Sequence, residues 1–315
     1  MSTLKRYAFA LGPLTAAALW GGMYVVSKWG FSQVPPVTLG FLRVVLGAGA
    51  LVAVLRVGNA RSRPAPGDTA ADGGRTVARA DWPRFGALGA WVTLTIATQF
   101  LGTDLTNASQ GSLLTVLTPV FTVGLGTLVL GERVTARKAA GIALAGVGTA
   151  VVLSGQYDLG AMAAGNAVGV ALLLVASLAW AGFTVYGAPV VRRYSALTAA
   201  TYATVAAVPM LAVLSTVELA VLGYGLGAIP LDARSALVVA YLGLGSTAAA
   251  WYLWYKGLEY VPAGTVAVFF FAQPVVGAAL GAALLGEHLG PGFVAGGALM
   301  ALGVWIVSRE RVDRD

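Results

Sequence analysis

The stretch Thr118–Arg133, TPVFTVGLGTLVLGER, is an apolar run of helical length with a proline near its start and Gly-Glu near its end. A second stretch, Gln273–His288, reads QPVVGAALGAALLGEH and follows the same plan 155 positions later. The first copy runs on into a basic tail, VTARK, whereas the second runs on into LGPG. The doubled stretch indicates that the chain contains two related halves whose connecting tails differ in charge.

The composition is that of a membrane protein. Hydrophobic residues make up 58% of the 315 residues, charged residues only 10%, and the mean hydropathy is +0.80. Soluble domains carry about 25% charged residues, and a helix that spans a bilayer needs about 20 apolar residues. The sequence predicts an all-α polytopic membrane protein with ten spans, at residues 8–29, 37–56, 85–103, 108–130, 136–154, 165–187, 197–221, 235–257, 263–285 and 290–307.

The placement of cations predicts the topology. With a cytoplasmic N-terminus, 17 of the 20 Lys and Arg fall at cytoplasmic ends or loops, and only Lys28, Arg43 and Arg234 do not. Cytoplasmic loops accumulate Lys and Arg, so we expect both termini inside the cell and an inner-membrane location. Residues 57–84 form the one long linker, which we expect to be a mobile cytoplasmic loop. The net charge of +7 therefore reports topology, and no nucleic-acid partner is expected.

The repeat extends beyond the opening stretch. At the same offset, six residues of the first half align with identical residues of the second: Pro119 with Pro274, Leu130 with Leu285, Gly131 with Gly286, Glu132 with Glu287, Gly141 with Gly296, and Gly148 with Gly303. Two five-helix units follow, residues 8–154 and 155–308, with a cytoplasmic tail at 309–315. Five is odd, so the second unit is predicted to cross the membrane in the opposite sense. Inverted repeats are typical of secondary transporters, with the substrate site between the halves.

These features resemble one known family. Two units that each end in Leu-Gly-Glu before a glycine-spaced helix, together with Trp20-Gly21 and FLRVVLGAGAL around Arg43, are similar to EamA-type transporters of the drug/metabolite transporter superfamily. The resemblance covers most of the chain. It implies a ten-helix exporter or permease of small metabolites, which is not an enzyme and uses no cofactor. The family's substrates are diverse, so the resemblance does not choose one.

Polar and aromatic residues recur at helical spacing within the predicted spans, as the lining of a cavity would. We expect amino acids or related compounds to bind there, because amphipathic zwitterions suit Trp, Tyr, Gln and Arg together. Pro119 and Pro274 are predicted to break helices and to act in gating. Trp254 and Tyr255, close to a helix end, are expected in an interfacial belt instead. The predicted substrate-binding residues are Trp20, Tyr24, Arg43, Trp91, Thr95, Gln99, Thr118, Trp180, Thr184, Trp251 and Gln273.

The charged residues leave two questions open. Arg43 lies inside a predicted span, where it either meets an anionic substrate group or locks two helices together. The carboxylates fall at helix ends and none is mid-span, which disfavours a proton-driven exporter of lipophilic cations. Glu132 and Glu287 are expected to end helices and tie loops rather than to carry protons.

Other functions have little material in the sequence. There is no cysteine and His288 is the only histidine, so no metal site and no catalytic residue is predicted. A membrane enzyme, a lipid or lipid-linked metabolite flippase, and a non-transporting sensor or assembly subunit remain as alternatives. The expected partners are a small-molecule substrate and the lipid bilayer, and the chain is expected to be a monomer or homodimer.

Overall fold

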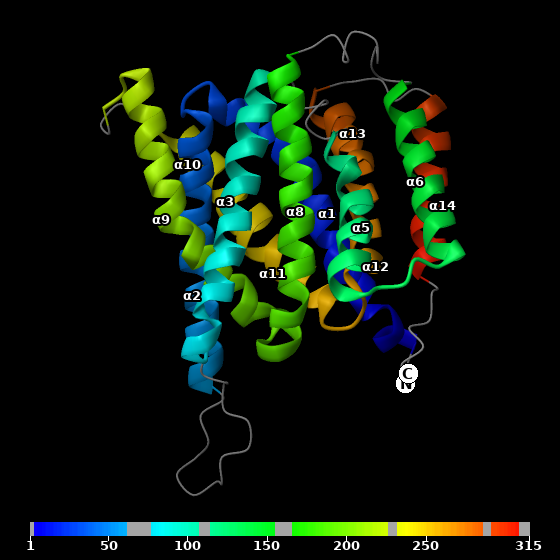
Figure 1. The fold of residues 1–315 in the computed structure, drawn as a ribbon. Coiled ribbons are helices and arrows are strands. Elements are labelled where there is room, and N and C mark those ends of the chain that lie inside the picture. The colour runs from blue at the N-terminus through cyan, green and yellow to red at the C-terminus, as the bar shows by residue number, and fades with distance from the viewer. Residues whose placement is uncertain are drawn as a thin grey trace, which may run out of the picture.

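The computed structural model describes residues 3–61, 77–106, 114–154, 166–225, 232–285 and 291–308, and these are almost entirely helical (Figure 1). Within them, six helices are long and apolar enough to cross a membrane: Ala10–Phe31, Pro36–Ala60, Arg79–Leu105, Ala167–Tyr194, Ala196–Leu222 and Ala233–Leu258. The protein is therefore an all-α, multi-pass membrane protein.

Most described helices lie within a few residues of the predicted spans, but the helix at 108–130 is described only from Thr118 and the span at 263–285 is divided by a 3-10 turn. Their bounds are α1 Thr3–Phe31, α2 Pro36–Arg61, α3 Trp82–Leu105, α5 Thr118–Leu130, α6 Ala136–Ser154, α8 Ala167–Tyr194, α9 Ala196–Leu222, α10 Ala233–Ala240, α11 Ala250–Leu258, α12 Ala263–Val268, α13 Ala272–Leu285 and α14 Pro291–Ser308. The predicted loop at 57–84 is helical at both ends: α2 continues to Arg61, and a 3-10 turn begins at Arg79. Residues 62–76 of that loop lie outside the described part.

One helix differs from a regular α-helix. A π-helical stretch, Tyr241–Ala249, joins α10 to α11, so the predicted span at 235–257 is a single helical run with a widened middle. Such stretches occur often at functional sites, since they displace backbone carbonyls from the usual bonding pattern. Nothing in the sequence YLGLGSTAA predicts it.

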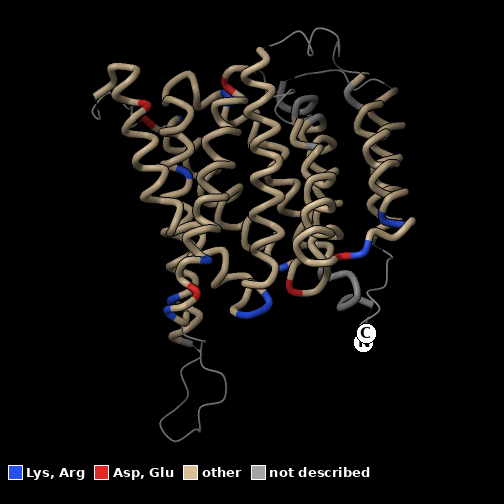
Figure 2. The backbone as a smooth tube through the Cα atoms, in the orientation of Figure 1, with Lys and Arg blue, Asp and Glu red and all other residues tan. Residues whose placement is uncertain are grey.

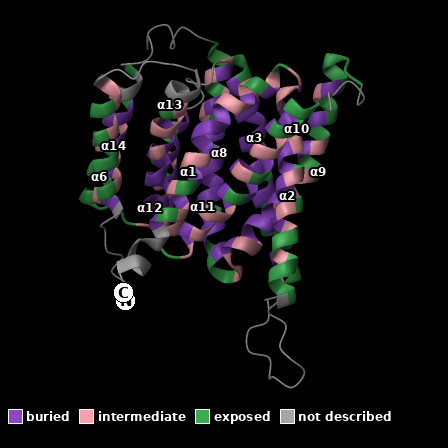
Figure 3. Ribbon diagram, turned by 180° about the vertical axis from the view of Figure 1, so that it is seen from behind, coloured by how far each residue is buried: buried purple, intermediate pink, exposed green. Residues whose placement is uncertain are grey.

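The core runs through the middle of the bundle, where the buried residues concentrate (Figure 3). Helix α1 packs against α11 and α13, while α3 packs against α8 and α9. Most Lys and Arg of the described helices gather at one end of the bundle, the lower end in Figure 2. We refer to it as the basic end. This asymmetry is what the topology prediction requires.

Helices α6 and α14 form a pair at the edge of the bundle (Figure 1). Glycines set their separation. A Cβ on Gly148 would lie 2.6 Å from the carbonyl oxygen of Gly296, and a Cβ on Gly303 would lie 2.5 Å from the carbonyl oxygen of Gly141. Small residues let membrane helices approach this closely. The aligned glycines of the repeat thus meet crosswise, Gly148 against Gly296 and Gly141 against Gly303.

Glutamates contact the starts of helices that are distant in sequence, where unpaired backbone N–H groups and the helix dipole favour an anion. Glu132 accepts hydrogen bonds from Ala263 and Gly264 at the start of α12, at 2.7 and 3.0 Å. It therefore ties the segment just after α5 to another helix, which agrees with the structural role expected of it; Glu287 lies outside the described residues. Two further glutamates do the same, Glu218 for Val37 and Thr38 and Glu259 for Ala196.

Candidate functional site: a central polar cavity

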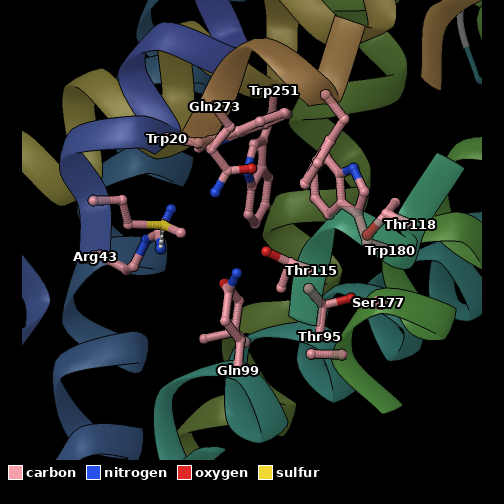
Figure 4. A pocket seen from close by; sticks show the side chains of 14 residues that line it. Trp20, Arg43, Thr95, Gln99, Thr115, Thr118, Ser177, Trp180, Trp251 and Gln273 are labelled. Atoms are coloured by element: carbon pink, nitrogen blue, oxygen red, sulfur yellow. Dashed lines mark hydrogen bonds between the residues drawn. The ribbon is translucent and has the colours of Figure 1, made fainter. Parts of the chain in front are cut away.

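A small cavity of about 20 Å³ lies between helices in the middle of the bundle (Figure 4). Its walls come from α1, α2, α3, α8 and α11 and from the chain just before and within α5 and α13. Side chains far apart in the sequence converge there, which is typical of a ligand site built between membrane helices. The lining residues are Trp20, Met23, Arg43, Thr95, Ile96, Gln99, Thr115, Thr118, Ala176, Ser177, Trp180, Trp251, Phe270 and Gln273.

Two interruptions in the helices present polar groups to the cavity. A 3-10 turn, Thr115–Leu117, precedes α5, and another, Phe269–Phe271, precedes α13. Pro119 and Pro274 lie just after these turns, within the first three residues of their helices, where a missing N–H costs little. Both prolines therefore mark helix starts beside the cavity. Their predicted part in gating is not tested by this geometry.

Four buried polar atoms at the cavity have no hydrogen-bond partner among the described residues. They are the hydroxyl of Thr118, the indole Nε1 of Trp180, and both the oxygen and the nitrogen of the Gln273 side chain. Nearly all buried polar groups in folded proteins are hydrogen-bonded, so exceptions call for an explanation. Two further unpaired atoms, on Ser27 and Thr103, lie away from this lining, whereas these four belong to three residues of one cavity and include donors as well as acceptors. The Gln273 amide also lies near the Tyr24 hydroxyl, although it makes no hydrogen bond of ordinary geometry there.

The opposite side of the cavity is closed by a hydrogen-bonded cluster. The Gln99 amide nitrogen donates to the Tyr24 hydroxyl at 2.9 Å, and that hydroxyl lies 2.8 Å from Thr115 Oγ1. Ser177 donates to the carbonyl of Leu114 at 3.2 Å. This cluster joins α1, α3 and α8 to the chain before α5.

Arg43 is almost completely buried, with 1% of its surface exposed. Its Nε donates to Thr247 Oγ1 at 2.8 Å and its Nη2 to the carbonyl of Ser246 at 2.9 Å. Its Nη1 contacts Met23 Sδ at 2.9 Å, and its guanidinium lies 5.3 Å from the Phe100 ring centroid. Arg43 thus locks α2 onto the π-helical stretch, as the structural alternative expected, and it also lines the cavity; its contact with an anionic substrate group stays a prediction.

Aromatic rings form the apolar part of the site. Trp20 lies 5.0 Å from Trp180, 5.3 Å from Trp254 and 5.5 Å from Phe270, between ring centroids. Trp254 is fully buried in this cluster, so its assignment to an interfacial belt was wrong. Tyr255 is fully buried as well and stacks on Phe183, which corrects the same assignment.

The structure brings most of the predicted binding residues together. The predicted residues that line the cavity are Trp20, Arg43, Thr95, Gln99, Thr118, Trp180, Trp251 and Gln273. Tyr24 lies behind this lining, where its hydroxyl forms hydrogen bonds with Gln99 and Thr115, two residues of the lining. Thr184 is buried elsewhere and accepts a hydrogen bond from Trp254 Nε1 at 3.0 Å.

Trp91 lies outside the central cavity, contrary to the prediction. Its ring stacks on Tyr186 at 5.9 Å with an interplanar angle of 13°, and it lines a second cavity. The sequence reasoning in turn missed apolar lining residues, namely Met23, Ile96, Ala176 and Phe270. Their residue types are those of any packed helix, so no sequence signal distinguishes them.

The described lining of the cavity contains one charged residue, Arg43, and no Asp or Glu. Within the described residues, no group of three or more His, Cys, Asp or Glu could hold a metal ion. The lining therefore offers hydrogen-bonding groups and aromatic faces to a small ligand, and its described residues show no paired acid and base for a reaction.

Comparisons with known proteins identify relatives over most of the chain. The family described as the EamA-like transporter family matches twice, at residues 8–154 and 167–309. An uncharacterized transporter of Archaeoglobus fulgidus is 29% identical over 93% of this chain and 95% of that protein. A probable amino-acid metabolite efflux pump of Salmonella typhimurium is 28% identical over 93% and 92%.

Two further matches bear on substrate and fold. A probable terminal-alkyne amino-acid exporter of Streptantibioticus cattleyicolor is 30% identical over 66% of each chain. One solved crystal structure superposes with a TM-score of 0.71 over 95% of each chain, at 20% sequence identity, which shows a shared fold.

Proposed function

Because this chain belongs to the EamA-like transporter family of the drug/metabolite transporter superfamily, we propose that it carries a small polar metabolite through the central cavity. The family establishes a transporter; the substrate and the mechanism are our proposal. The observation that carries it is the set of four unpaired polar atoms on Thr118, Trp180 and Gln273, which face one cavity. A bound ligand with both donors and acceptors would pair them.

We propose alternating access between two inverted five-helix units, residues 8–154 and 155–308, which together make ten spans. The two family matches support this division. So does the crosswise contact of the aligned glycines, Gly148 against Gly296 and Gly141 against Gly303, which is the contact expected of two inverted copies. The 3-10 turns before Pro119 and Pro274 supply a second pair of matching features.

The orientation follows from the basic end of the bundle. The positive-inside rule places that end in the cytoplasm, together with both termini, the loop at 57–84 and the tail at 309–315. The protein is then an inner-membrane transporter. We propose that it acts as a monomer or homodimer.

Amino acids or related compounds are the substrate class that fits best. The cavity combines aromatic faces, amide and hydroxyl groups and one cation, which suits an amphipathic zwitterion with an apolar side chain. Two relatives are named for amino-acid or amino-acid metabolite export, in agreement with this choice. The described lining holds no carboxylate that could carry a proton, which favours exchange without ion coupling.

The test is binding to the purified protein followed by transport in proteoliposomes. A thermal-shift panel would hold amino acids, nucleosides, sugars, organic acids and lipophilic cations, since a ligand of the folded state raises its melting temperature. Hits would then be tested for counterflow with labelled substrate. We expect an amino-acid hit that also exchanges across the membrane.

A matched pair of variants locates the site. Trp180→Phe removes the unpaired Nε1 and keeps an aromatic ring, so we expect binding to weaken about tenfold for one lost hydrogen bond. Trp254→Phe removes an Nε1 that is bonded to Thr184, and should lower stability with little effect on binding. A panel without hits at millimolar concentration would contradict the proposal and favour a flippase or a sensor.

A further inference from the structure

A second cavity lies on the outer surface of the bundle, near the basic end. It is a groove of about 510 Å³ between α3, α8 and the end of α5. It is separate from the central cavity, since no residue lines both. Its lining residues are Arg84, Ala87, Leu88, Trp91, Val129, Leu130, Tyr186, Pro189, Val190, Arg193 and Tyr194.

The groove opens toward the surroundings of the helices. Ala87, Val129, Tyr186 and Pro189 are exposed, on three different helices. All four belong to predominantly apolar helices that carry their arginines near the basic end, so the apolar part of this surface suits the acyl chains of a bilayer. The walls are aliphatic, and the stacked pair of Trp91 and Tyr186 adds a flat aromatic surface. Such walls match a hydrocarbon chain.

Two arginines stand at the same groove. Arg84 and Arg193 both pair with one carboxylate, that of Asp81, at 2.6 and 3.2 Å. The Asp81 side chain is only 4% exposed, whereas the side chains of Arg84 and Arg193 are 61% and 55% exposed. Tyr194 also donates a hydrogen bond to Asp81. The buried carboxylate therefore orients two exposed guanidinium groups at the edge of the groove.

We propose that this groove binds an anionic phospholipid of the cytoplasmic leaflet. Its phosphate would contact the exposed faces of Arg84 and Arg193, and one acyl chain would lie along Trp91 and Tyr186. Basic pockets beside membrane helices on the cytoplasmic side are suited to anionic headgroups, and arginine binds phosphate through two parallel N–H groups.

A lipid in this groove would contact helices that also line the central cavity. The groove lies where α5 and α3 flank α8, and these three helices carry Thr118, Gln99 and Trp180 into the central cavity. The lipid would therefore fill a gap between elements of the transport site without entering it.

The experiment is native mass spectrometry of the full-length protein in detergent with phosphatidylglycerol or phosphatidylcholine added. We expect preferential retention of phosphatidylglycerol. The double variant Arg84→Gln/Arg193→Gln should lower that retention about tenfold, through the loss of two arginine–phosphate contacts. Arg192→Gln changes a neighbouring exposed arginine that does not line the groove, and should leave retention unchanged.

A second variant separates the groove from the charge. Ala87→Trp fills the exposed groove and keeps every charge, so we expect it to lower retention of both lipids; size-exclusion elution and melting temperature check its fold. Equal losses in the double variant and in Arg192→Gln would overturn the proposal in favour of general surface charge. Competition by soluble glycerol phosphate at equal concentration would overturn it as well, because the site would then take a free phosphate rather than a lipid.

Discussion

The indole Nε1 of Trp20 and the guanidinium Nη2 of Arg43 donate to the same carbonyl oxygen, that of Ser246, each at 2.9 Å. This carbonyl belongs to the π-helical stretch, where the backbone bonding pattern is widened. One acceptor thus fixes a cavity-lining ring of α1 and a buried cation of α2 against the second half of the chain.

Arg43→Lys should destabilise the protein. An ammonium is a point charge and cannot replace the fork that reaches both Thr247 and Ser246, so one hydrogen bond of a charged group is lost, at a cost of about 1.5–3 kcal/mol. Thermal unfolding in detergent measures this loss of stability. Thr247→Val provides a graded comparison, because it removes the acceptor of Arg43 Nε together with the hydroxyl's own hydrogen bond to the Leu242 carbonyl. An unchanged melting temperature in Arg43→Lys would show that the fork does not hold the helices.

Gln273→Leu should separate stability from function. The Gln273 amide is 1% exposed and has no hydrogen-bond partner among the described residues, so its replacement by an apolar side chain of similar size removes an uncompensated polar group. We expect a melting temperature equal to or above the parent's, together with loss of ligand binding. Retained binding in a stable variant would exclude Gln273 from the site.

The α6–α14 contact offers a test with a control two residues away. In Gly148→Ala the new Cβ would lie 2.6 Å from the Gly296 carbonyl oxygen, whereas at Gly146 nothing lies within 4 Å. Overpacking of this kind costs about 1–3 kcal/mol. Gly146→Ala should instead be neutral or stabilising, by up to about 1 kcal/mol from helix propensity. The test compares the melting temperatures of Gly148→Ala and Gly146→Ala in the same detergent. Equal melting temperatures would contradict the close contact between α6 and α14.

Glu132→Gln should affect folding rather than proton coupling. The variant loses the negative charge at the start of α12, a contribution of about 1 kcal/mol, while one side-chain oxygen can still accept a hydrogen bond. The melting temperature should fall modestly and the pH profile of transport should keep its shape. The opposite pattern, an unchanged melting temperature with a flattened pH profile, would identify Glu132 as a proton carrier.

The sequence predicts the helices well because each one must be both long and apolar, and that signal is local. The direction of a side chain within a helix is harder to predict, as Trp91 shows. Residues turn by about 100° each along an α-helix, so two steps of four leave Trp91 about 80° away from Gln99. That angle is enough to move Trp91 from the central cavity to the outer groove.

The π-helical stretch limits prediction for a related reason. Its wider turns shift the faces of the residues beyond it, so a regular 3.6-residue period does not give the directions of Trp254 and Tyr255. Both were expected at the membrane interface because they lie close to a helix end. In the structure α11 packs between α1, α8 and α9, which buries both rings. Packing partners of this kind cannot be inferred from one helix alone.

The glutamates that contact helix starts differ in when their partners are synthesised. Glu218 and Glu259 are synthesised after the helices that they contact, so each meets a helix already made. Glu132 is synthesised 131 residues before Ala263 and has no such partner until α12 leaves the ribosome. A nascent chain that stops before Ala263 therefore lacks the backbone N–H groups that the Glu132 carboxylate accepts from. This contact between the two halves of the protein forms only after α12 has been synthesised.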